Sequence, residues 1–346
     1  MGEASTPKAT IVVPVCNSAS SIQRCLDSLL AQSERSIQVV CVNDGSTDDS
    51  LTVLRQIAQT DDRVLVIDQE NAGVSCARNV GIDAAEGEVV FFVDADDYID
   101  AQTVERVLQA MGSSDAEVAV FGGVCEPADA APMRVQQLMS PNAGTFGTRD
   151  PQLLFHANAQ PYACRAAFSR TLLNREGIRF APSLALGEDV VFQFAAYALA
   201  NKTVVMPDKF YHYVMESDSA THEFNSDEAR TKKLDAHMMM LEDVLEDWAV
   251  YGLLGLCPGE LVTWFLDLIV FDLARLDADD FHRVAGRVNR AFTTFLGTEW
   301  ADATAKGAVR RVAHKLVAAT SGVSMADATL FYLSTRGLKA CLERFI

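Results

Sequence analysis

The chain has 346 residues, of which 49% are hydrophobic and 22% are charged, and its formal net charge at pH 7 is −18. A chain of this length usually forms one large domain and a smaller one. The acidity argues against nucleic-acid binding, because that requires a basic surface to replace the counterions of the phosphates.

Neither a targeting signal nor a membrane span is indicated by the sequence. Residues 1–10 show no basic segment followed by an apolar one, so we expect no secretory signal and a cytoplasmic protein. The most apolar stretch, residues 261–274, is too short to span a membrane and contains two aspartates, which favours a buried helix. The eight cysteines form no C-x-x-C pair, so we expect reduced core residues without a disulfide framework or zinc site.

The first part of the chain alternates between strand and helix patterns. Apolar runs rich in β-branched residues, typical of buried strands, cover 9–15, 37–42, 64–67 and 89–93. Helical spacing of apolar residues lies between them, at 22–30, 51–58 and 71–81. This alternation predicts an α/β domain with a mostly parallel, doubly wound sheet and right-handed crossovers.

Polar clusters follow several of these strands. The side chains concerned are Asn17 after the first strand, Asp44, Ser46 and Asp48 after the second, and Asp94, Asp96 and Asp97 after the fourth. The carboxyl ends of parallel strands meet at one sheet edge, which is where ligands bind in open α/β folds. Carboxylates packed together need a cation, and Mg²⁺ or Mn²⁺ prefers their oxygens. The alternative is a solvated, aspartate-rich turn that starts the next helix.

The usual phosphate-binding signatures are absent from the sequence. No G-x-G-x-x-G follows the first strand, and no G-K-[ST] occurs anywhere. Dinucleotide dehydrogenases and P-loop enzymes are therefore disfavoured. The pattern instead favours a nucleotide whose phosphates are held through a metal on the aspartates.

Six segments, in this order, resemble the motifs of the GT-A fold glycosyltransferases of family 2, an inverting family that uses nucleotide-diphosphate sugars. They are residues 12–17, 42–48, 71–81, 93–97 with the D-x-D motif Asp94-Ala95-Asp96, 187–192, and 211–213 after the last core strand. The resemblance implies a GT-A domain, Rossmann-like with a mostly parallel sheet, over residues 1–222. The pattern is helical from about Asp227, so residues 223–346 are expected to form a C-terminal helical region.

Carried over by residue, the resemblance implies a donor site, a metal site and a catalytic base. The nucleotide sugar would be bound by Pro14, Val15, Asn17, Asp44, Ser46, Arg78, Asp94 and Ala95. The Mn²⁺ or Mg²⁺ that bridges the diphosphate would be held by Asp96, with His212 as a further ligand, while Asp189 would be the general base and Glu188 would position the acceptor.

Other interpretations of these residues stay open. Arg78 could be a structural ion-pair partner of the aspartates, and His212 a packed strand residue. Asp189 could be an N-terminal helix residue that interacts with the helix dipole, and Glu188 could only cap that helix. The sequence also departs from the family at two places. Cys16 stands where an aromatic residue is common, and Val214 where an arginine is frequent.

The resemblance implies a metal-dependent, inverting glycosyltransferase that moves a sugar, expected to come from a UDP-sugar, to a hydroxyl of a glycan or lipid-linked acceptor in cell-surface polysaccharide synthesis. A nucleotidyltransferase would need a basic, glycine-rich loop after the first strand, which residues 17–21 lack. The other alternative is a catalytically silent module that binds nucleotides or glycans. Acceptor specificity is expected in the irregular region 126–185.

The C-terminal region contains one basic cluster: Lys306, Arg310, Arg311, His314 and Lys315. An ordinary amphipathic helix on the catalytic domain would account for it. The alternative is peripheral association with an anionic membrane surface at the inner face, where lipid-linked acceptors are found.

Overall fold

The computed structural model describes residues 6–345 except 129–130, 132, 216–226 and 320–321. The chain divides into two compact units, Met1–Ser219 and Ala220–Ile346. The domain boundary expected from the sequence, between residues 222 and 223, lies outside the described residues.

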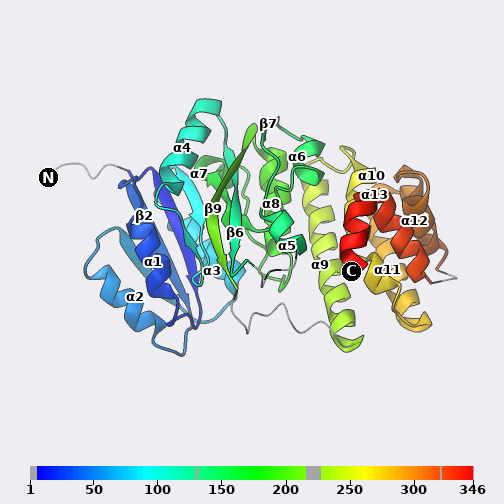
Figure 1. Cartoon of the computed structure of the whole chain (residues 1–346), viewed down its shortest axis with the longest axis horizontal. Helices are drawn as coiled ribbons and strands as arrows, with labels where there is room; N and C mark the ends of the chain where they lie inside the picture. Colours follow the sequence, from blue (N-terminus) through cyan, green and yellow to red (C-terminus); the bar gives the residue numbers. More distant parts are fainter. Residues whose placement is uncertain (1–5, 129–130, 132, 216–226, 320–321, 346) are drawn as a thin grey trace. The chain divides into compact units, whose positions relative to one another are not determined.

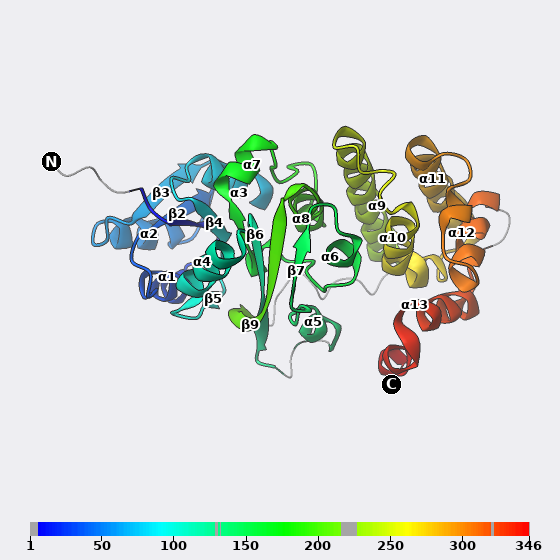
Figure 2. The ribbon, with the colours of Figure 1, turned by 90° about the horizontal axis from the view of Figure 1, so that it is seen from above.

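The first unit is built on a nine-stranded mixed sheet (Figures 1 and 2). Its strands are β1 Ala9–Val15, β2 Ile37–Asp44, β3 Val64–Gln69, β4 Val89–Phe92, β5 Tyr98–Ile99, β6 Val118–Glu126, β7 Gly144–Gly147, β8 Ala166–Ser169 and β9 Lys202–Val214. They lie in the order β3-β2-β1-β4-β8-β6-β9-β5, with β7 also paired to β9. Strands β1 to β4 are parallel, and β6 is parallel to β9. The short strands β5, β7 and β8 pair antiparallel.

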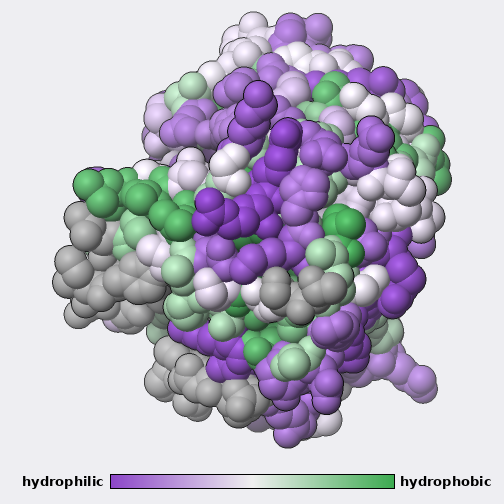
Figure 3. Space-filling model, turned by 90° about the vertical axis from the view of Figure 1, so that its right-hand side faces the viewer, coloured by the Kyte–Doolittle hydropathy of each residue, from purple (hydrophilic) through white to green (hydrophobic). Residues whose placement is uncertain are grey.

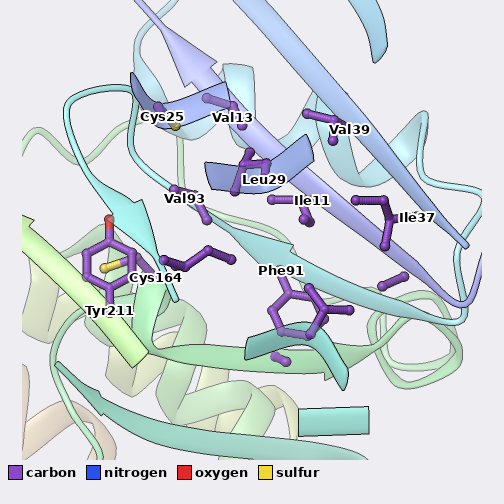
Figure 4. Packing of buried hydrophobic residues seen from close by; sticks show 14 of the residues in the cluster. Ile11, Val13, Cys25, Leu29, Ile37, Val39, Phe91, Val93, Cys164 and Tyr211 are labelled. Atoms are coloured by element: carbon purple, nitrogen blue, oxygen red, sulfur yellow. The ribbon is translucent and has the colours of Figure 1, made fainter. Parts of the chain in front are cut away.

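Helices cover both faces of this sheet. In the first unit they are α1 Ile22–Leu30, α2 Ser50–Ala58, α3 Val74–Asp83, α4 Thr103–Ser114, α5 Met133–Leu138, α6 Pro151–Phe155, α7 Arg170–Arg175 and α8 Glu188–Leu199, with the 3-10 helix η1 Ala163–Arg165. One face packs against α1, α2 and α4. Figure 4 shows Ile11 and Val13 of β1 beside Cys25 and Leu29 of α1 within this core.

The opposite face packs against α3 and α8. Val40 and Val42 of β2 contact Ala77 of α3, and Phe92 of β4 lies 5.7 Å from Phe192 of α8, centroid to centroid. Alternate residues of each central strand thus meet different helices, which explains why these strands have continuous apolar sequences. The predicted α/β fold with a mostly parallel central sheet is confirmed.

The structure adds elements that the sequence did not indicate. Region 126–185 contains α5, β7, α6, η1, β8 and α7. Residues 211–213 lie inside β9, so placing them after the last core strand was wrong. The pattern of β9 is interrupted by Pro207 and Asp208, near the point where its register with β6 shifts, and this hides a 13-residue strand.

The second unit is helical, as predicted. Its helices are α9 Asp227–Val250, α10 Pro258–Leu273, α11 Ala278–Leu296, α12 Ala308–Ala318 and α13 Met325–Phe345, with the 3-10 helix η3 Trp300–Ala303. Large apolar side chains such as Trp248, Phe265 and Phe292 are buried in it. In the part of the chain that the structure describes, no helix has the length and apolar character needed to cross a membrane.

The basic cluster lies on and just before α12, and several of its members contact their own unit. Arg310 donates to the carbonyl oxygens of Asp302 and Thr304, and Lys315 forms a 2.7 Å ion pair with Asp327. Figure 3 shows hydrophilic residues over much of one face of the molecule, with hydrophobic residues in separate patches. These contacts show that the helix packs within its own unit, while its packing on the catalytic domain and membrane association both stay predictions.

The packing of α3 on β1 leaves no room for a side chain at Gly81. A Cβ atom there would lie 2.2 Å from Cγ1 of Val12, whereas a Cβ at Gly112, also inside a helix, would meet nothing within 4 Å. We expect Gly81→Ala to lower the free energy of unfolding by about 1–3 kcal/mol through overpacking. Gly112→Ala, the matched control, should raise it by up to about 1 kcal/mol. Urea unfolding followed by circular dichroism measures both, and equal midpoints for the two variants would contradict the packing described.

Candidate active site

A cavity of about 180 Å³ lies where β1, β2 and β4 end and α3 begins. It is lined by Pro14, Val15, Cys16, Ser18, Asp44, Val74, Ala77, Asp94, Ala95 and Asp96. Six of these were predicted as site residues. The other four, Cys16, Ser18, Val74 and Ala77, were not predicted, although all but Ser18 lie inside the segments 12–17 and 71–81 that resemble family motifs. None of the ten lining residues is cationic, although three are aspartates.

Asn17 and Ser46, which were predicted to bind the donor, connect the loops that follow β1 and β2. The side-chain oxygen of Asn17 accepts a hydrogen bond of 2.8 Å from the backbone of Thr47, and its backbone N–H donates to Ser46 Oγ at 3.0 Å. Asn17 has a φ of 52°, a left-handed conformation that asparagine tolerates. These contacts hold one wall of the cavity in place.

Asp44 is a buried carboxylate that shapes the loop leading into α3. Its Oδ1 accepts hydrogen bonds from the Gln69 side chain at 2.7 Å and from the backbone of Ala72 at 2.9 Å. Its Oδ2 accepts from the backbone of Gly73 at 2.9 Å. Asp44 therefore lines the cavity and also determines where α3 begins.

Arg78 on α3 contacts three carboxylates from two distant parts of the sequence, one after β4 and two adjacent ones at the start of α8. Its Nη2 lies 2.9 Å from Asp94 Oδ1, and its Nη1 lies 2.8 Å from Asp189 Oδ1 and 3.2 Å from Glu188 Oε1. The arginine is only 4% exposed, and its guanidinium lies 5.1 Å from the Phe180 ring centroid. The structure thus brings four predicted site residues into one cluster, which we call the Arg78 cluster: Arg78, Asp94, Glu188 and Asp189.

Burial and charge act in opposite directions on the groups of this cluster. Burial alone would lower the pKa of Arg78, but the carboxylates of Asp189, Asp94 and Glu188 raise it above its ordinary value, so the arginine stays charged. Burial raises the pKa of Asp189 above that of an ordinary carboxyl, although Arg78 opposes this effect. A carboxylate with a raised pKa is a stronger proton acceptor. The second oxygen of Asp189 accepts a hydrogen bond of 3.1 Å from the backbone of Ala163.

Asp94 and Asp96 are the carboxylates of the D-x-D motif that line the cavity. The backbone carbonyl of Asp96 accepts a hydrogen bond of 2.6 Å from Arg24, and its side chain is exposed. Among the described residues, no group of three or more His, Cys, Asp or Glu side chains could hold a metal ion. Mg²⁺ is commonly held by one or two carboxylates together with substrate phosphates, so these two carboxylates fit an ion that binds with a diphosphate.

His212, the other predicted metal ligand, lies on β9. Its two ring nitrogens lie 2.9 Å from Glu126 Oε1 and 2.9 Å from Asp100 Oδ1, and its ring stacks on Tyr98 at 4.2 Å. Coordinating a metal would require His212 to give up one of these contacts. The geometry suits the alternative of a packed strand residue, and metal binding by His212 stays a prediction.

Asp97, the third carboxylate after β4, lies in the interior. It accepts hydrogen bonds from the Tyr211 hydroxyl and, at 2.7 Å, from the backbone of Val214. Burial raises its pKa to about 8. Asp97 therefore ties the D-x-D loop to the end of β9, a role that spacing alone could not separate from those of its neighbours.

Comparisons with known proteins agree on one family. The family model described as Glycosyl transferase family 2 matches residues 10–177. The chain is 30% identical to the uncharacterized glycosyltransferase EpsJ of Bacillus subtilis over 261 residues, which is 74% of either protein. It is 31% identical over 217 residues to a poly(ribitol-phosphate) beta-glucosyltransferase of Bacillus spizizenii, covering 61% of this chain and 33% of that protein.

Solved structures share the fold. The crystal structure of S. aureus TarS 1–349 in complex with UDP superposes with a TM-score of 0.70 at 19% identity, covering 96% of this chain and 92% of that one. The same protein has been solved with UDP-GlcNAc, with a TM-score of 0.66. A mannosyltransferase from Pyrobaculum calidifontis, in complex with GDP-Man and Mn²⁺, gives a TM-score of 0.51 at 18% identity.

Removing Arg78 should destabilise the first unit in a pH-dependent way. Arg78→Leu leaves buried carboxylates without a cation, which typically costs about 3–5 kcal/mol at neutral pH. In this variant burial keeps the pKa values of Asp189 and Glu188 above their unfolded-state values, so the folded chain binds more protons than the unfolded chain. Stability should therefore fall as the pH rises, and the loss relative to wild type should be larger at about pH 8 than at about pH 5.

Urea unfolding at both pH values measures this difference. Arg55→Leu is the matched control, because Arg55 forms an exposed ion pair of 3.1 Å with Asp68. It should change stability by less than about 0.5 kcal/mol at either pH. A loss for Arg78→Leu that is equally small, or that does not depend on pH, would contradict the description of the Arg78 cluster.

Proposed function

The chain belongs to glycosyl transferase family 2, and from this membership we propose that it moves a sugar from a nucleotide-diphosphate sugar to an acceptor hydroxyl with inversion at the anomeric carbon. The observation that carries the proposal is the Arg78 cluster. One buried guanidinium contacts Asp94, which lines the cavity, and Asp189, which we propose as the general base. The residues that bind the sugar donor and those that act on the sugar acceptor would then belong to one ion-pair network.

A UDP-sugar is our proposed donor, bound in the cavity between the ends of β1, β2 and β4. The fold is shared with TarS, whose solved complexes contain UDP and UDP-GlcNAc. Pro14, Val15 and Asp44 would contact the nucleoside, and Asp94 the ribose. Cys16 lines the cavity without an aromatic ring, so this position would not stack on the base.

A diphosphate in this cavity would meet aspartates and no cationic side chain of the lining. Two anions placed together without a cation repel each other strongly when they are shielded from water. This supports Asp96, together with Asp94, as the holder of Mn²⁺ or Mg²⁺. When bound, such an ion would act as a Lewis acid that stabilises the negative charge of the leaving diphosphate.

The chain's own residues would activate and place the acceptor. Asp189 accepts the proton of the acceptor hydroxyl as the oxygen attacks the anomeric carbon. The new carbon–oxygen bond forms as the bond to the diphosphate breaks, and the electron pair of that bond leaves with the diphosphate. Each carboxylate oxygen has two lone pairs, so Asp189 can accept this proton while it keeps its contacts with Arg78 and Ala163. Glu188 would position the acceptor beside it.

Attack from the face opposite the leaving group inverts the anomeric centre in one displacement and needs no covalent enzyme intermediate. We propose a glycan or lipid-linked acceptor at the cytoplasmic face of a membrane, in polysaccharide synthesis. The resemblance to EpsJ and to a poly(ribitol-phosphate) glucosyltransferase supports this context. The names of these relatives, both glycosyltransferases, disfavour a silent binding module and a nucleotidyltransferase.

Two aspartate variants should separate binding from turnover. In isothermal titration with UDP and GDP, Asp96→Ala should abolish the part of nucleotide binding that depends on Mn²⁺, because it removes an oxygen ligand. Asp189→Asn should keep this binding, yet it should lower sugar transfer by about 10²- to 10⁴-fold because the amide cannot accept the proton.

Asp208→Ala serves as the control. Asp208 lies outside the cavity lining and pairs with Arg106 at 3.0 Å, so binding and transfer should stay at wild-type levels. The proposal fails if neither nucleotide binds to the wild type with or without metal. The assignment of the base fails if Asp189→Asn transfers sugar at the wild-type rate.

A further inference from the structure

Arg165, at the end of η1, is a fully buried cation that has no role in the proposed reaction as described above. Its relative exposure is 0%, and burial lowers its pKa. In the described part of the chain, its hydrogen bonds go to main-chain carbonyl oxygens, in contrast to those of Arg78. A buried charge without a carboxylate partner is unfavourable, and an apolar side chain would fill the same volume without that cost.

A guanidinium can bind several carbonyl groups at once, which an apolar side chain cannot. Arg165 donates to the carbonyl oxygens of Phe121 on β6 at 3.3 Å, Pro161 at 2.9 Å and Asn158 at 3.4 Å. The planar guanidinium carries five N–H groups, which can donate to carbonyl oxygens that lie in different directions. Arg165 therefore fastens the segment 158–161 to the central sheet.

The residue that follows this segment has an unfavourable backbone conformation. Tyr162 has a φ of 80°, and a bulky residue rarely adopts a positive φ. Such a conformation persists only where surrounding contacts determine it. A further contact comes from α8, where the Tyr197 hydroxyl donates to the carbonyl oxygen of Ala159 at 3.1 Å.

The contacts of Arg165 matter for Ala163, which lies just after the segment 158–161. The backbone N–H of Ala163 donates to Asp189 Oδ2 at 3.1 Å, while Oδ1 of the same carboxylate accepts from Arg78 at 2.8 Å. With both oxygens held, the carboxylate can rotate only if one of these bonds breaks. The position of Ala163 in turn depends on the segment that precedes it.

We propose that Arg165 is a positioning residue for sugar transfer: by fastening residues 158–161 to β6, it holds the N–H of Ala163 where it orients the carboxylate of Asp189. This inference rests on the proposed function, in which Asp189 is the general base. Arg165 itself would touch neither donor nor acceptor. Its effect should therefore appear in the chemical step and not in donor binding.

The test compares three arginine variants in steady-state transfer assays. Arg165→Gln should lower kcat by about 10- to 100-fold, because a small displacement of a catalytic group costs this much. The KM for the sugar nucleotide and the affinity for UDP should stay within about twofold of wild type. Arg165→Lys, which still carries donors, should recover part of kcat.

Arg170→Gln is the control, because Arg170 also donates to a carbonyl, that of Gly87 at 2.7 Å, just before β4 begins.

A pH profile separates positioning from a general loss of structure. Burial raises the pKa of Asp189, whereas Arg78 and the Ala163 N–H lower it, and Asp94 raises it. Loosening Ala163 should therefore raise this pKa and move the acidic limb of the kcat profile to higher pH. Tyr197→Phe, which releases the carbonyl of Ala159, should lower kcat several-fold and move the limb in the same direction. It replaces Arg165→Gln if that variant does not fold.

Wild-type kcat in folded Arg165→Gln, or an unchanged pH profile in both Arg165→Gln and Tyr197→Phe, would overturn the inference. A parallel fall of kcat and UDP affinity would also overturn it, because it would indicate a structural role only. Asp189→Asn, assayed beside these variants, distinguishes the two levels of the proposal. If Asp189→Asn is active, the base assignment itself is wrong; if it is inactive while Arg165→Gln is fully active, only the role of Arg165 is wrong.

Discussion

The buried guanidinium of Arg78 is the interaction on which the site depends. A cation at 4% exposure costs free energy unless hydrogen-bond acceptors replace the water it has lost, and three carboxylates do so here from the end of β4 and the start of α8. The requirement is mutual, since each of these carboxylates is itself partly withdrawn from water. The packing of α3 and α8 on one face of the sheet is thereby coupled to the geometry of the loop that carries the D-x-D motif.

This sharing of one cation has a consequence for the proposed chemistry. Arg78 is neutralised by protein carboxylates, and the cavity lining contains three aspartates, one of which is Asp94 itself, and no cation. The diphosphate of a sugar donor would therefore need positive charge from a group that is not part of the lining. For this reason we propose a divalent cation on Asp96. At the other end of the cluster, burial raises the pKa of Asp189 while Arg78 opposes the rise. The same guanidinium thus bears on both halves of the reaction that we propose.

Much of this arrangement could be predicted from the sequence, because apolar runs and helical spacing locate β1 to β4 and their helices, and polar residues after strands indicate the ligand edge. Asp94, Asp96 and Asp97 look alike in sequence, however, and only tertiary contacts separate an ion-paired, an exposed and a buried carboxylate. Two of the three carboxylates that contact Arg78, Glu188 and Asp189, lie more than 100 residues from it in the sequence. Ala163 acts through its main-chain N–H, and the side chain of Arg165 contacts main-chain carbonyl oxygens, and such contacts leave no pattern in a single sequence.

The anomeric configuration of the product is the measurement that tests the central claim most directly. Once a donor is turned over, nuclear magnetic resonance of the freshly formed glycoside reports the configuration at the transferred sugar. A single displacement, with Asp189 accepting the proton across from the leaving diphosphate, predicts that an α-linked UDP-sugar gives a β-linked product. A product that retains the α configuration would contradict the account, because one displacement with one base cannot produce it.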